Sequence, residues 1–180
     1  MVSCPFGAIS DKSQIFQLTR ALQEEGSEII AEIAPAFVGQ FGENINPRNI
    51  KAALIELGFK GVHEVALGAD IGAVAEAHHY VEKVVTGELP FLLTSCCPSW
   101  SMMAKKFFPT MIDNISQELT PMVATARKVK QDQPDAKVVF IGPCASKKLE
   151  AMRRTRSDVD FVYFENWMPC LMHVKLILLF

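Results

Sequence analysis

The stretch Leu93-Thr94-Ser95-Cys96-Cys97-Pro98-Ser99-Trp100 places two adjacent cysteines between an apolar run and a proline. The run Leu89 to Leu93 predicts a strand, and a proline is well tolerated in the first turn of a helix. Both thiols are therefore expected where a strand ends and a helix begins. Because the start of a helix stabilises negative charge, this position suits a metal ligand or a reactive sulfur rather than a disulfide.

Helical and strand-like segments alternate along the rest of the chain. Helices are predicted over 13–25, 46–57, 71–85, 98–108, 121–131 and from Ser146 to about Arg154. Strands are predicted over 28–34, 62–67, 89–95, 137–141 and 159–164. Strands separated by helices of this length are typical of an α/β fold, in which a parallel sheet is flanked by helices.

Three of the predicted strand ends carry residues suited to a binding site: Ala34-Pro35-Ala36, Ser95 to Pro98, and Gly142-Pro143-Cys144. In a parallel sheet these ends lie along one edge, and ligands of open α/β sheets bind beyond that edge. We therefore expect Cys97 and Cys144 to contribute to one metal centre, although they are far apart in the sequence.

The composition is that of a globular, core-forming protein, since 49% of the 180 residues are hydrophobic, 21% are charged and the formal net charge is −2. No basic block is present, which argues against a nucleic-acid partner. The N-terminus does not resemble a signal peptide, and the apolar tail 168–180 is shorter than the ~20 residues of a membrane span. A cytoplasmic protein is expected, whose five cysteines favour metal or redox chemistry over a disulfide framework.

The two cysteine motifs resemble those of the iron-only, or [FeFe], hydrogenases. The segment Thr94 to Trp100 matches the first signature motif of that family, and Pro143 to Lys147 with Glu150 matches most of the second. Family-like sequence runs from about Ser3 to Phe161. The resemblance implies the first lobe of a two-lobed domain that carries the H-cluster, which is a [4Fe–4S] cluster joined to a diiron subcluster.

The resemblance assigns a role to each residue of the two motifs. Cys97 and Cys144 match two of the four ligands of the [4Fe–4S] cluster. Cys96 matches the thiol that exchanges protons at the diiron subcluster. Lys147 resembles the lysine that donates a hydrogen bond to an iron-bound cyanide.

The resemblance also implies a pocket lining and a proton relay. The backbone of Ala34, Pro35 and Ala36 corresponds to the wall of the diiron pocket, and Glu76 and Ser116 match positions of the relay. Carboxyl and hydroxyl groups both donate and accept protons, so they suit such a path. Taken alone, Glu76 fits a solvated helix face better, and only its spacing to Cys96 brings the relay role level with that interpretation. The implied partners are H2 and protons, and ferredoxin or another electron-carrier subunit.

Some positions and both ends depart from the family pattern. His79, Gly142 and Ala36 replace residues that are common in highly active members, and in this respect the chain resembles sensory or electron-bifurcating branches. Residues 1–12 resemble a remnant of a ferredoxin-like [4Fe–4S] domain, residues 13–162 the N-terminal lobe, and residues 163–180 a divergent tail. The third motif of the family, with two further cluster cysteines, is not found, so we expect little or no hydrogenase activity from this chain alone.

Two other functions remain open. A hydrogenase-like hydrogen sensor or iron–sulfur assembly protein would share the fold and the cluster cysteines without catalysis, although Cys96 and Lys147 argue against an assembly factor. A zinc or thiol-redox module built on Cys96, Cys97 and Cys144 is disfavoured, because their spacing matches no common zinc pattern such as paired C-x₂-C.

Overall fold

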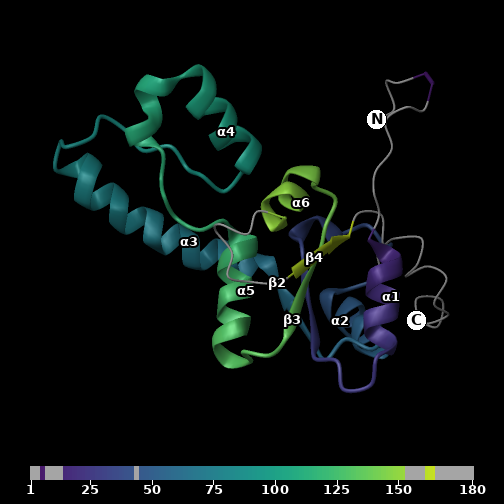
Figure 1. Cartoon of the computed structure of the whole chain (residues 1–180). Helices are drawn as coiled ribbons and strands as arrows, with labels where there is room; N and C mark the ends of the chain where they lie inside the picture. Colours follow the sequence, from purple (N-terminus) through teal and green to yellow (C-terminus); the bar gives the residue numbers. More distant parts are fainter. Residues whose placement is uncertain (1–4, 7–13, 43–44, 153–160, 165–180) are drawn as a thin grey trace.

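The computed structural model describes residues 5–6, 14–42, 45–152 and 161–164. These residues contain a sheet of four parallel strands in the order β2-β1-β3-β4, with β1 Ile29–Ile33, β2 Gly61–Glu64, β3 Lys137–Ile141 and β4 Phe161–Phe164. Helices flank the sheet (Figure 1). The predicted α/β fold with a parallel sheet is therefore confirmed.

The first described helix precedes β1, and the others connect the strands. The helices are α1 Ile15–Gln23, α2 Pro47–Glu56, α3 Val65–Tyr80, α4 Pro98–Phe107, α5 Pro121–Asp132 and α6 Ala145–Ala151. Three short turns of helix accompany them: the 3₁₀ turns η1 Pro35–Phe37 and η3 Pro109–Asn114, and the π-helical turn η2 Val81–Val85.

Strand β1 is the centre of the core, because all five of its residues are buried. On one face, Ala31 packs in a cluster with Leu18 of α1 and Leu54 of α2. On the other face, Ile30 packs with Ala126 of α5 and the neighbouring strand. A strand that is covered on both faces reads as a nearly continuous apolar run, which is the pattern of Ile29–Ile33.

Local sequence signals explain where the helices begin. Asn46 caps α2, since its side chain accepts hydrogen bonds from the backbone N–H groups of Arg48 (2.9 Å) and Asn49 (3.2 Å), and Pro47 occupies the first turn. Helix α3 begins at Val65, earlier than predicted, because the apolar segment 65–67 continues into the helix instead of extending β2. A short apolar run fits either a strand or a buried helix, so the sequence pattern alone does not separate the two.

The strand predicted over 89–95 is wrong. Leu93 forms only an isolated bridge, in which its N–H donates to the carbonyl of Asn114 (2.8 Å) and its carbonyl accepts from the N–H of Ser116 (2.8 Å). The Asn114 side chain also donates to the carbonyl of Phe91 (2.9 Å). Helix α3 and η2 carry the chain away from the sheet (Figure 1), so this segment pairs with residues 114–116 instead of with a sheet strand.

Candidate functional site

The carboxyl ends of β1 and β3 bring two of the predicted segments together. Ile33 pairs with Ile141 in register, and the N–H of Ala34 donates to the carbonyl of Ile141 (2.9 Å). The segments Ala34-Pro35-Ala36 and Gly142-Pro143-Cys144 therefore leave the sheet side by side, as the sequence predicted. Ala34 is buried, whereas Pro35 and Ala36 are exposed.

Helices, not strands, bring the Cys96-Cys97 segment to this edge of the sheet. Cys97 is the residue before α4 and Cys144 is the residue before α6. Two residues beyond each of them, the hydroxyl of Ser99 donates to the hydroxyl of Ser146 (2.8 Å). The first turns of α4 and α6 are thus in contact, so the two cysteine motifs meet through helices and not, as predicted, through neighbouring strand ends.

The thiols at this edge are available as ligands. Cys96, Cys97 and Cys144 are exposed and form no disulfide, and the side chains of Cys97 and Cys144 do not cap their helices. Within residues 14–42 and 45–152, however, no group of three or more His, Cys, Asp or Glu side chains is arranged to hold a metal. The described residues therefore fit two thiolate ligands of an iron–sulfur cluster, not the usual set of four. Cys4 and Cys170 lie outside the described residues.

Lys147 links the two motifs directly. Its Nζ donates to the backbone carbonyl of Cys96 (3.0 Å) and forms an ion pair with Oε2 of Glu150 (2.8 Å). The same carboxylate oxygen accepts a hydrogen bond from the hydroxyl of Thr120 (3.0 Å). Thr120 precedes α5 and is buried, and no sequence signal pointed to it, because its partner is far away in the chain.

The two predicted relay residues are placed differently. Ser116 is buried beside Leu93, and its Oγ accepts from the N–H of Glu118 (3.2 Å). Glu76 lies half-buried on α3. In the described part of the chain, no hydrogen bond or ion pair joins the Glu76 carboxylate to Cys96 or to Ser116. The relay therefore stays a prediction.

Gly142 lies in a tight position between the two strand ends. A Cβ at this residue would lie 2.8 Å from Cε1 of Phe140 and 2.9 Å from the Cβ of Ala34. The Phe140 ring thus fills the space that a larger residue at 142 would need. Glycine at this position, a departure from the family pattern, is required by the packing of the edge.

Glu32 is a buried acid that sequence reasoning did not single out. It lies within β1 with no exposed surface, and neither of its carboxylate oxygens has a hydrogen-bond partner among the residues that the structure describes. Burial raises the pKa of Glu32 well above 4.5. His63 pairs with it in register on β2, and burial, followed by the charge of Lys51, lowers the pKa of His63. The available signal was one acid within an apolar strand.

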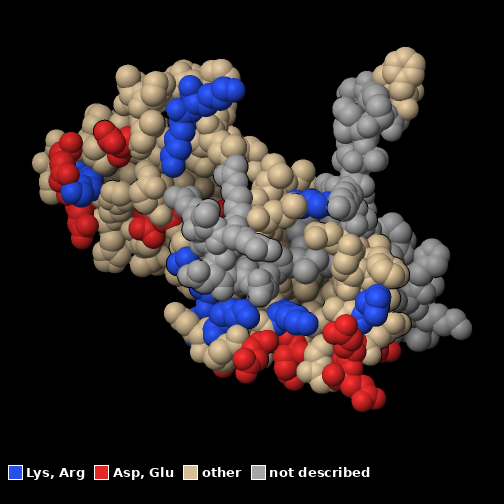
Figure 2. Space-filling model, in the orientation of Figure 1, with Lys and Arg blue, Asp and Glu red and all other residues tan. Residues whose placement is uncertain are grey.

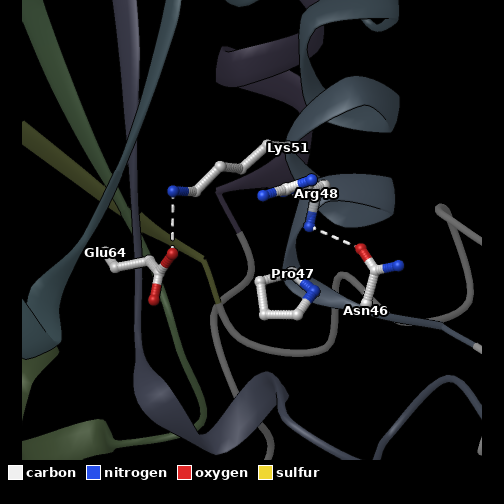
Figure 3. A pocket seen from close by; sticks show the side chains of 5 residues that line it. All are labelled: Asn46, Pro47, Arg48, Lys51 and Glu64. Carbon is white, nitrogen blue, oxygen red and sulfur yellow. Dashed lines mark hydrogen bonds and ion pairs between the residues drawn. The ribbon is translucent and has the colours of Figure 1, made fainter.

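A cavity of about 420 Å³ lies elsewhere, between the start of α2 and the end of β2 (Figure 3). Asn46, Pro47, Arg48, Lys51 and Glu64 line it. Lys51 and Glu64 form an ion pair (2.7 Å), and Asn46 already binds the first N–H groups of the helix. Lys51, Glu64 and Asn46 are therefore partnered within the chain, and none of the described cysteines lines the cavity.

The family model described as "Iron only hydrogenase large subunit, C-terminal domain" matches residues 27–165. The chain belongs to this family. It is a hydrogenase-like iron–sulfur protein, and the matched residues include both cysteine motifs and the whole described sheet. In the described residues, no helix combines the length and the apolar character needed to cross a membrane.

Curated relatives of this hydrogenase-family chain include enzymes and an assembly factor. Iron hydrogenase 1 of Clostridium pasteurianum is 32% identical over 83% of this chain and 29% of the relative. A NADP-reducing hydrogenase subunit of Solidesulfovibrio fructosivorans is 30% identical over 88% of this chain and 32% of the relative. A cytosolic Fe-S cluster assembly factor of Scheffersomyces stipitis is 27% identical over 67% of this chain and 25% of the relative. The chain thus spans about a third or less of their length.

Proposed function

We propose that this chain supplies the first lobe of a hydrogenase-type centre, in which H2 is reversibly converted to two protons and two electrons. The observation that carries the proposal is the contact between the first turns of the two helices that follow Cys97 and Cys144, with the ammonium of Lys147 hydrogen-bonded to the carbonyl of Cys96. The family match and the relatives named as hydrogenases support the same conclusion.

Each residue of the edge has a distinct task in this proposal. Cys97 and Cys144 hold one side of a [4Fe–4S] cluster as thiolates, and the remaining ligands come from outside the described residues. When bound, the cluster and its diiron subcluster supply electron storage and the open iron site. Cys96 takes and releases a proton at its Sγ, and Lys147 balances negative charge nearby. The backbone of residues 34–36 bounds the pocket.

The proposal extends to partners and location. Protons move between Cys96 and solvent through Ser116 and Glu76, and electrons pass to ferredoxin or to another electron-carrier subunit. The protein acts in the cytoplasm. The domain boundaries at residues 12 and 162 belong to the same proposal.

Anaerobic reconstitution with iron and sulfide tests the ligand assignment. Iron and acid-labile sulfide per chain are measured for the wild type and for Cys97→Ser, Cys144→Ser and Cys96→Ser. We expect the first two variants to lose bound iron and Cys96→Ser, the adjacent control, to retain it. Equal iron content in all four proteins, or a loss in Cys96→Ser alone, contradicts the assignment. With the diiron subcluster added, H2 uptake by this chain alone is expected to be negligible, and substantial turnover contradicts that expectation.

The similarity to cytosolic Fe-S cluster assembly factors favours a second candidate, iron–sulfur assembly without catalysis. Transfer of a reconstituted cluster to an apo-ferredoxin separates the two functions. An assembly protein transfers its cluster in a way that depends on Cys97 and Cys144 but not on Cys96. A hydrogenase lobe retains its cluster in the presence of the acceptor.

A further inference from the structure

Lys147 is held in place by more than its own helix. A lysine side chain is long and flexible, so a fixed ammonium position requires partners on several sides. The Nζ of Lys147 has two, the carbonyl of Cys96 and the carboxylate of Glu150, and the two side chains of the ion pair are only 14% and 10% exposed. The ion pair is therefore in a largely water-excluded setting, where a charge-assisted hydrogen bond is strong, whereas the carbonyl of Cys96 belongs to an exposed residue of the cysteine edge.

Glu150 is itself fixed from a different element. Helix α6 has only seven residues, and Glu150 lies in its last turn. The hydroxyl of Thr120, 5% exposed and located just before α5, donates to the same Oε2 that binds Lys147. Thr120 does not use this hydroxyl to cap its own helix. The carboxylate thus receives two donors from two elements, which restricts where its oxygen can lie.

The contacts close into a ring that contains both cysteine motifs. The segment that ends at Thr120 also accepts a hydrogen bond at the carbonyl of Glu118 from the hydroxyl of Ser95 (3.2 Å), the residue before Cys96. The ring therefore runs from Cys96 to Lys147, Glu150 and Thr120 and returns through Ser95. Any movement of the Glu150 carboxylate moves the ammonium relative to the cysteine loop.

We infer that Glu150, locked by Thr120, is a positioning residue that directs the Lys147 ammonium toward an anionic ligand at the cysteine edge. An ammonium has three N–H donors, and two of them are used by the Cys96 carbonyl and Glu150. Within the described part of the chain, the geometry leaves the third donor available to a bound acceptor. This inference rests on the proposed function, in which that acceptor belongs to the iron–sulfur centre.

Chemical labelling of lysines tests the positioning without any cofactor. The acylation rate of Lys147 by acetic anhydride is measured by mass spectrometry, relative to Lys60, which is exposed. We expect Glu150→Gln to raise this ratio about fivefold, equivalent to about 1 kcal/mol, because the ammonium gains freedom to leave its site. Thr120→Val is expected to raise it about twofold, and Thr120→Ser, which keeps the hydroxyl, to leave it unchanged.

The matched control is Asp132→Asn, which removes the partner of Lys128 in an exposed ion pair. It is expected to leave Lys147 labelling unchanged. Circular dichroism verifies that each variant is folded. If Glu150→Gln does not fold, the Lys147 labelling ratio of Thr120→Val tests the inference in its place. An unchanged Lys147 ratio in a folded Glu150→Gln or, in its absence, in Thr120→Val overturns the inference.

A second measurement separates this inference from the proposed function. After reconstitution with iron and sulfide, the acylation rate of Lys147 in the wild type is expected to fall at least about twofold, because the anion occupies the third donor. In Glu150→Gln the rate is expected to fall less. If the wild type binds no iron, the proposed function fails while the cofactor-free labelling still decides the positioning. If iron binds but Lys147 is protected equally in both proteins, the role of Glu150 toward the ligand is refuted.

Discussion

At the scale of single residues, Glu32 is the least expected feature of the fold. A carboxyl group that is buried without a hydrogen-bond partner is costly, and the cost is far greater when it is ionised. Its raised pKa means that the folded chain keeps this proton at pH values where the unfolded chain has lost it. The ionised form is therefore the one that opposes folding.

The pH dependence of stability follows from this difference. Above about pH 4.5 the folded chain binds more protons than the unfolded chain, so the free energy of unfolding falls as the pH rises, until Glu32 ionises in the folded state. Urea denaturation of Glu32→Gln is expected to show this fall removed, with a gain of about 1–3 kcal/mol at pH 8 and little change at pH 4. Glu56→Gln, on the exposed surface of α2, is the control. A pH profile that Glu32→Gln leaves unaltered would show that the acid is hydrated in solution.

At the scale of elements, the contact between α3 and α5 depends on one of two glycines. A Cβ at Gly68 would overlap the carbonyl oxygen of Pro121 and the hydroxyl of Thr125, whereas a Cβ at Gly72 would meet only the carbonyl of Leu119, at 3.9 Å. Gly68→Ala is expected to lower the free energy of unfolding by about 1–3 kcal/mol through overpacking. Gly72→Ala is expected to raise it by up to about 1 kcal/mol, since alanine favours helix. Thermal denaturation of both variants distinguishes them, and equal effects would contradict this packing.

The elements also show what the sequence can and cannot predict. Strands β1 and β3 were predicted within a residue or two, because a strand buried on both faces has a distinctive apolar run. The segment 89–95 has the same local character, but its backbone pairs with residues 114–116. This pairing depends on the direction in which α3 carries the chain away from the sheet, which no local pattern reveals. Likewise, the cysteine motifs are local and could be recognised, whereas the Thr120–Glu150 bond joins residues that no local pattern relates.

At the scale of the whole molecule, α3, η2 and α4 form an arm with a large exposed apolar surface. Figure 2 shows that uncharged residues cover much of this arm, at the upper left. The most exposed of its large apolar residues are Leu67, Val74, Val81, Val85 and Phe107. Several large, well-exposed apolar side chains on one arm of a molecule are typical of an interface.

Self-association through this arm is therefore expected when the chain is isolated. Sedimentation velocity over a range of concentrations is expected to show association for the wild type, and less of it for Val74→Lys with Val81→Glu. The control is Phe16→Glu, which removes an equally exposed apolar residue from α1. A wild type that remains monomeric throughout, or a control that dissociates the chain as effectively, would contradict the assignment to the arm.

The contact between Ser99 and Ser146 has a consequence for the affinity of the centre. This hydrogen bond joins residues 47 positions apart through protein atoms alone. Closing a flexible loop of that length costs about 3 kcal/mol in chain entropy, and here the fold itself, rather than a shared ligand, offsets that cost. The cysteine edge is thus preorganised, and metal affinity becomes linked to fold stability: a substitution that loosens the fold weakens iron binding even where it touches no ligand.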